Sequence, residues 1–116
     1  MSLLKYDSWA VLIKDINKQY KLIEFLKSKD YNVVGINEMV GTVNGIEIYE
    51  SLKDVPHNID VVGIVEDSIN TYAILDEMEL LDIVNIWFEK DSYNEEVIRK
   101  SKAMKLNIEY NSKLED

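Results

Sequence analysis

The sequence predicts an α/β fold in which a mostly parallel sheet of about five strands is covered by helices on both faces. Three short apolar runs carry this prediction, at residues 9–13, 59–65 and 83–88. Strands that are buried on both faces of a sheet have near-continuous apolar sequences of this kind. A helix-like stretch follows each run, and strands that alternate with helices are typical of parallel sheets.

The first half of the chain shows this alternation, interrupted once. We expect a first strand over residues 9–14, a helix over 17–28, where apolar residues recur at helical spacing, and a second strand over 32–36. Residues 1–7 are expected to form an arm or a short helical turn. The pair Asn44 and Gly45 is a tight-turn signal, so residues 46–49 are expected to form a short edge strand. One helical turn is expected over 51–54, before Pro56.

The second half repeats the pattern. We expect a strand over residues 60–65, a helix over 68–80 and a strand over 83–88. Ser92 and Glu95 have the spacing of a capping box, which predicts a helix from there to about Met104. An edge strand over 106–110 and a polar tail over 111–116 complete the chain. This order indicates a single Rossmann-like domain over residues 1–116, a three-layer sandwich with the first strand near the middle of the sheet.

Composition excludes several classes of function. A length of 116 residues with 47% hydrophobic side chains suits one domain with a real core. The formal net charge of −9 disfavours nucleic acids and anionic membrane surfaces as partners. No cysteine, no apolar stretch of membrane-spanning length and no signal-peptide pattern are present, so we expect a cytoplasmic protein.

Three segments resemble one family. Residues 31–37 read YNVVGIN, residues 45–62 run from Gly45 through YESLKDVP to IDVV, and residues 94–96 read NEE. These segments are similar to the small CoA-binding-domain proteins, which are single Rossmann-like domains like the CoA-binding half of succinyl-CoA synthetase. The resemblance extends over residues 9–114. It implies the same fold and, as cofactor, CoA or a related nucleotide.

The positions that contact phosphate in that family differ here. Family members carry a Gly and then a Ser just after the first strand, where backbone N–H groups approach a phosphate; this chain has Ile13 and Asp15. After the third long strand, where the family has an Arg, the sequence reads Glu66, Asp67 and Ser68. At 111–114, NSKL replaces a family segment with Arg and Cys. The resemblance therefore implies an altered or lost phosphate site.

The candidate ligand-binding residues are those at the carboxyl ends of the predicted strands, where ligands bind in open α/β sheets. They are Ile13, Lys14, Asp15, Asn17, Asn37, Glu66, Asp67 and Ser68. The leading interpretation is a non-enzymatic protein that binds a small nucleotide-like or CoA-type ligand there. No nucleophile elbow or dinucleotide fingerprint occurs, and the single histidine, His57, has no positioned partner in the sequence.

Two alternatives remain open. The protein could be an interaction or regulatory module that retains the fold without a ligand, acting through a homodimer or another protein partner. The other alternative is a divalent-metal site, because hard cations favour clustered carboxylates such as those of Asp15, Glu38, Glu66 and Asp67. The same carboxylates could also be separate solvated side chains, balanced by Lys14, Lys18 and Lys90.

Overall fold

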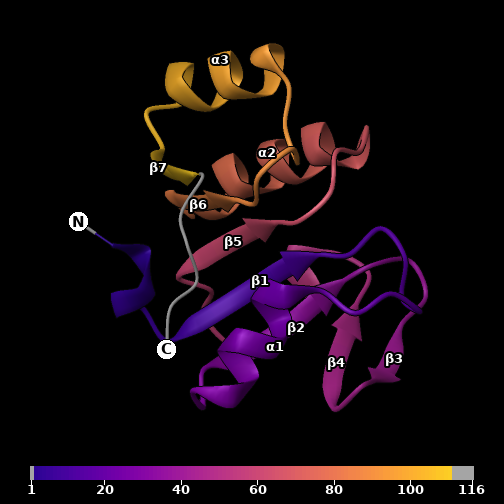
Figure 1. Cartoon of the computed structure of the whole chain (residues 1–116). Coiled ribbons are helices and arrows are strands. Elements are labelled where there is room, and N and C mark those ends of the chain that lie inside the picture. Colours follow the sequence, from indigo (N-terminus) through magenta and orange to yellow (C-terminus); the bar gives the residue numbers. More distant parts are fainter. Residues whose placement is uncertain (1, 111–116) are drawn as a thin grey trace.

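The structure is a computed structural model that describes residues 2–110 (Figure 1). A 3-10 turn over Leu3–Lys5 precedes the first strand, and a second such turn lies at Leu52–Asp54. The strands are β1 (Ser8–Leu12), β2 (Asn32–Ile36), β3 (Gly41–Val43), β4 (Ile46–Tyr49), β5 (Val61–Ile64), β6 (Asn85–Phe88) and β7 (Asn107–Tyr110). The helices are α1 (Lys21–Ser28), α2 (Asn70–Leu81) and α3 (Glu95–Ala103).

All seven strands of this part of the chain form one sheet, in the order β3-β4-β2-β1-β5-β6-β7. Every neighbouring pair is parallel except β3 and β4, which form an antiparallel hairpin. The predicted central position of the first strand is confirmed. The expected count of about five strands was too low, and β4 is not at the edge, because β3 lies outside it.

The helices that connect the strands lie on both faces of the sheet. Figure 1 shows α1 on one face and α2 with α3 on the other. Alternate residues of β1 point to the two faces: Trp9 and Val11 pack with α1, whereas Ala10 and Leu12 pack with α2 and α3. The whole of β1 is buried, as its continuous apolar run predicts.

The face that carries α1 is closely packed. A methyl group placed on Gly63 of β5 would lie 2.8 Å from Cδ2 of Leu22, so the absence of a side chain lets α1 approach the sheet. The 3-10 turn at the N-terminus covers the β7 end of this face, where the Leu3 N–H donates to Oε1 of Glu109 at 3.0 Å. The ring of Trp87 lies fully buried on β6 and meets Trp9 edge to face, with 6.5 Å between the centroids.

Several predicted element boundaries were wrong, each for a local reason. α1 begins at Lys21 rather than at residue 17, because the backbone N–H of Asn17 bonds to Oδ1 of Asp15 in a turn. α3 is capped by Asn94, whose side chain accepts from the Val97 N–H. Ser92, the predicted cap, instead donates its hydroxyl hydrogen to the Glu89 carbonyl.

Other boundaries shift by one or two residues. β1 ends at Leu12, β5 covers Val61–Ile64, α2 begins at Asn70, and β6 begins at Asn85. The helix α2 ends where Asp82 adopts a left-handed conformation with φ 57°. Between residues 2 and 110, no helix combines the length and the apolar character that crossing a membrane requires. The predicted polar tail, 111–116, lies outside the described residues.

Candidate functional site

At the carboxyl ends of the neighbouring strands β1 and β5, the connecting segments leave the sheet towards opposite faces. The loop after β1 leads to α1 on one face, and the loop after β5 leads to α2 on the other. In open α/β sheets this divergence creates the crevice in which ligands bind. Seven of the eight predicted site residues lie in these two loops, and Asn37 follows β2. The seven are Ile13, Lys14, Asp15, Asn17, Glu66, Asp67 and Ser68.

In this protein the crevice is bridged by its own side chains. The hydroxyl of Tyr20 donates to Oε1 of Glu66 and accepts from the backbone N–H of Asp15 at 3.1 Å. The ammonium group of Lys18 forms an ion pair with the same Glu66 oxygen at 3.4 Å. Farther out, Lys14 donates to the Asp67 carbonyl at 3.4 Å. These contacts join the loop after β1 to the loop after β5.

The Tyr20 hydroxyl is held in its protonated form. Its pKa is raised from 10.0 to about 12, first by burial of the hydroxyl and then by the hydrogen bond to Glu66, against a smaller lowering by the Asp15 N–H. An ionised phenol beside the Glu66 carboxylate would place two like charges together. At neutral pH the hydroxyl therefore acts as a donor to Glu66.

Three backbone N–H groups of the loop after β1 have acceptors close by in the chain. The Asp15 N–H bonds to Tyr20, the Asn17 N–H bonds to Oδ1 of Asp15 at 2.9 Å, and the Lys18 N–H bonds to the Asp15 carbonyl at 3.1 Å. Backbone N–H groups between a strand and the following helix are the kind of donor that binds phosphate in other proteins. Asp15 thus supplies two of these three acceptors, its side chain and its carbonyl, and Tyr20 supplies the third.

Ile13 fills the space between this loop and β4. Its side chain lies over Gly35 of β2, where a methyl group would come within 2.5 Å of the Ile13 Cδ1 atom. The hollow that remains between Ile13, the loop and Ile48 has a volume of about 20 Å³, about one water molecule. On the α1 side of the sheet, the crevice is therefore closed.

Asn37 and Ser68 organise the loops rather than point at a shared centre. Asn37 donates its side-chain N–H to the Ile13 carbonyl at 2.7 Å and accepts from the Met39 N–H at 2.8 Å. Ser68 accepts from the Asn70 N–H at 3.1 Å, at the start of α2. Asn17 is exposed in its turn.

On the α2 side of the sheet, a cleft of about 450 Å³ remains open beside the bridged crevice. It has an apolar floor, formed by Leu12, Ile13, Ile36, Ala73 and Ile74, and a polar wall, formed by Lys14, Asn37, Glu38, Glu50, Ser51, Asn70 and Glu77. Its size lies within the range of small-molecule sites, about 300–1,000 Å³. The predicted site residues Ile13, Lys14 and Asn37 line this cleft.

Sequence reasoning missed the far wall of the cleft, which α2 and the turn after β4 provide. Glu77 of α2 accepts from the backbone N–H groups of Leu52 and Lys53, at 3.0 and 3.4 Å, and so holds the turn against the helix. Nothing local in the sequence signals this contact. The segment around Glu50 and Ser51 resembles the family, and this was the one sequence signal near this wall. The resemblance did not assign these two residues to the binding site.

The cleft is acidic. Glu38, Glu50 and Glu77 line it with Lys14 as the one lysine or arginine. The predicted group of four carboxylates has no common centre. The Glu66 carboxylate accepts from Tyr20, the Asp15 carboxylate accepts from the Asn17 N–H, and Glu38 lines the cleft. Within residues 2–110, no three histidine, cysteine or carboxylate side chains are placed so that they could hold a metal ion.

The family model for the CoA binding domain matches residues 14–113. The chain belongs to this CoA-binding-domain family. Solved structures with the same fold include a hypothetical protein from Pyrococcus horikoshii OT3, with a TM-score of 0.82 and 23% identity over 97% of this chain and 81% of that one. A conserved hypothetical protein from Pyrococcus furiosus has a TM-score of 0.80 and 18% identity over 93% and 96% of the two chains.

The same fold also occurs inside a larger enzyme. The dinucleotide-forming acetyl-coenzyme A synthetase 1 of Ca. Korarchaeum cryptofilum has a TM-score of 0.67 and 21% identity to this chain. The match covers 88% of this chain and 25% of the synthetase chain. At these identities the likeness shows the fold alone. A functional hypothesis therefore starts from family membership and from the arrangement of the cleft.

Proposed function

We propose that the protein is a non-enzymatic member of the CoA-binding-domain family that binds a small ligand in the open cleft without a working diphosphate subsite. One observation carries the proposal. The N–H groups of Asp15, Asn17 and Lys18, which follow β1, already bond within the chain, while a cleft of about 450 Å³ stays open beside them. These bonds support the proposed alteration or loss of the phosphate site, because the protein's own oxygen atoms accept from N–H groups that could otherwise bind phosphate.

Charge supports the same conclusion. A diphosphate entering between β1 and β5 would meet the Glu66 carboxylate, and a ligand in the cleft would meet Glu38 and Glu50. The negative charges of these carboxylates would repel the phosphate groups, and the nearby cations Lys14 and Lys18 already have oxygen partners. The apolar floor and the Asn70 amide suit an uncharged nucleoside or an amide-bearing chain such as pantetheine.

Titration calorimetry with CoA, adenosine and pantetheine tests the proposal. For the unmodified protein, we expect CoA to bind no more tightly than its better uncharged fragment. In the double variant Asp15→Ser with Glu66→Gln, two carboxylates leave the crevice, and CoA binding should strengthen by about tenfold, while adenosine binding stays within about twofold. Glu96→Gln, an exposed carboxylate on α3, is the matched control and should change neither.

Two results would contradict the proposal. The first is binding of CoA by the unmodified protein at least about a hundredfold tighter than either fragment, which would mean that the diphosphate contributes about 2.7 kcal/mol. The second is an absence of binding by all three compounds in both proteins. That result would favour the second candidate, an interaction module.

Exposed apolar side chains next to the cleft favour this second candidate. Met39 and Val40 follow Glu38 and are 59% and 63% exposed, and Ile69, which precedes Asn70, is 83% exposed. Apolar side chains with this exposure around a concave surface are typical of contact sites for other proteins. Measurement of the molecular mass in solution, with and without Ile69→Ser, tests a homodimer through this rim. A dimer that dissociates in the variant would support the module, and a monomer in both cases would argue against self-association.

A further inference from the structure

A separate groove lies between α3 and the carboxyl end of β7. Its volume is about 580 Å³, and it shares no lining residue with the cleft described above. Tyr93, Ile98 and Tyr110 form its floor, and Glu95, Arg99 and Lys102 stand along its α3 side. The volume is within the range of small-molecule sites, about 300–1,000 Å³.

The floor is an aromatic platform that is supported from behind. The rings of Tyr93 and Tyr110 lie 5.6 Å apart and are tilted by 37°, and the fully buried Phe88 meets Tyr93 edge to face at 5.4 Å. Tyr110 is 40% exposed. Aromatic side chains fixed in this way offer flat apolar area, and a planar ring can cover that area with little loss of conformational freedom.

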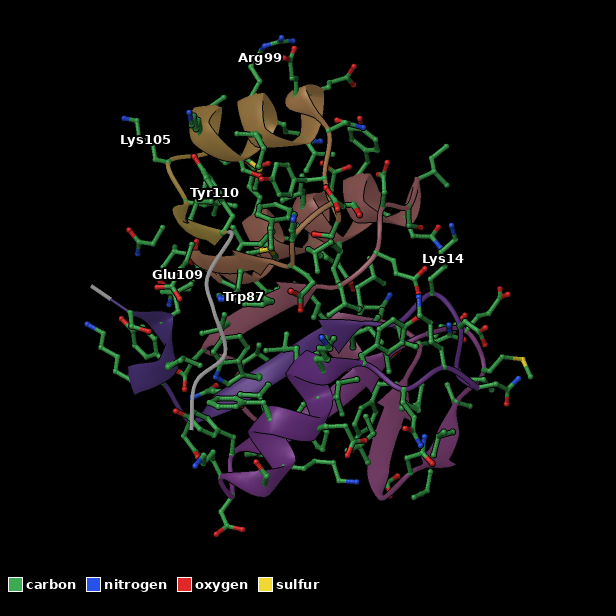
Figure 2. The ribbon with its side chains drawn as sticks, in the orientation of Figure 1. Lys14, Trp87, Arg99, Lys105, Glu109 and Tyr110 are labelled. Atoms are coloured by element: carbon green, nitrogen blue, oxygen red, sulfur yellow. The ribbon has the colours of Figure 1, made fainter. Side chains whose placement is uncertain are left out.

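The side formed by α3 carries a net positive charge in an acidic protein. Positions 95, 98, 99 and 102 share one face of the helix, and they include Arg99, the single arginine of a chain with a formal net charge of −9. Figure 2 shows Arg99 extending from α3 away from the sheet. Among the ion pairs of the described residues, Lys100 on the neighbouring face bonds to Asp76 at 2.8 Å, whereas Arg99 and Lys102 take part in none. An anion would satisfy both cations.

The groove has room for only a short stretch of extended peptide. α3 has nine residues, so the helical wall is about 14 Å long. An extended chain advances about 3.3 Å per residue, so that only about four residues would fit along it.

We propose that this groove binds a small aromatic anion. The ring of the ligand covers Tyr93, Ile98 and Tyr110, and its carboxylate or phosphate group lies between Arg99 and Lys102. The proposal concerns a different surface from the cleft and does not depend on the function proposed there.

Amide proton–nitrogen NMR spectra recorded during titration with naphthoate test this proposal. We expect saturable shifts of the amides between residues 93 and 102 and at Tyr110, and weaker binding of the uncharged isostere naphthalenemethanol. Arg99→Gln should weaken naphthoate binding about fivefold, which corresponds to about 1 kcal/mol, the upper range for an exposed ion pair. Lys53→Gln, an exposed lysine outside the groove, is the matched control and should leave binding unchanged.

The remaining arms of the experiment separate related ligands. Naphthyl phosphate in place of naphthoate shows whether a phosphate or a carboxylate is preferred, and tighter binding of either supports the site. The proposal fails if naphthalenemethanol binds as well as naphthoate, if the shifts map to the cleft around Asn37, or if they rise linearly without saturation. It also fails if an acidic peptide binds along α3 and naphthoate does not.

Discussion

The hydroxyl of Tyr20 connects the two loops of the crevice, and its removal by Tyr20→Phe should destabilise the protein without disturbing the core. The side chain is 6% exposed, and its ring packs beside α1, where phenylalanine fits equally well. The substitution deletes a hydrogen bond to the Glu66 carboxylate and one from the Asp15 N–H. A bond to a charged group contributes about 1.5–3 kcal/mol and a neutral one about 0.5–1.5 kcal/mol. In the variant, water can hydrogen-bond to Glu66 in place of the Tyr20 hydroxyl and recover part of this energy. We therefore expect the free energy of unfolding to fall by about 2 kcal/mol at neutral pH.

The difference between the two proteins should shrink in alkali. The pKa of Tyr20 is raised to about 12 in the folded protein from 10.0. Above the unfolded value, the unfolded chain loses this proton while the folded protein retains it, so the stabilising effect is complete below pH 10 and declines as the pH rises towards 12. At about pH 11 the decline reaches about 1.4 kcal/mol by linkage, and about 1 kcal/mol once solvent screening of the hydroxyl is allowed for.

Urea denaturation of both proteins at a series of pH values measures this effect. The control is Tyr72→Phe, since Tyr72 lies on α2 and its hydroxyl has no hydrogen-bond partner among the described residues. The control should change the free energy of unfolding by less than about 0.5 kcal/mol at every pH. Two outcomes would refute the reasoning: a Tyr20→Phe protein as stable as the control, or a difference from the unmodified protein that stays constant between about pH 8 and pH 11.

Substitutions at two further positions test the packing of α1 and the start of α3. Gly63→Ala places a methyl group 2.8 Å from Leu22 and should cost about 1–3 kcal/mol in thermal or urea denaturation, whereas a glycine with free space around it would give a gain of about 0.4–1 kcal/mol on the same change. A stabilised Gly63→Ala protein would show that α1 is not held by this contact. Asn94→Ala removes the acceptor for the Val97 N–H and should cost about 1 kcal/mol, while Asn94→Asp should retain the cap. Equal losses in the two Asn94 variants would argue against capping by this side chain.

The parts of the fold that local patterns encode were predicted well. The strands at 32–36 and 46–49 have the predicted bounds, because their apolar runs and the Asn44–Gly45 turn act over a few residues. β3 was missed, since Gly41–Val43 is a three-residue segment that becomes a strand through its pairing with β4. The predicted cap at Ser92 failed because a neighbouring residue, Asn94, formed the competing bond. One sequence can contain several residues that could cap a helix, and the path of the loop decides which of them does so.

The sequence by itself determined the parallel strands of the sheet, its layers, the family and the acidic character of the strand ends, because each of these depends on residue types and short spacings. The tertiary structure decided what those acidic residues do. Glu66 reaches Tyr20 across 46 positions of the chain, and Glu77 reaches Leu52 across 25. Both contacts follow from strand order and helix packing, which periodicity does not encode. The first contact bridges the crevice between β1 and β5, and the second holds the far wall of the cleft that stays open, a distinction that required the positions of all these elements at once.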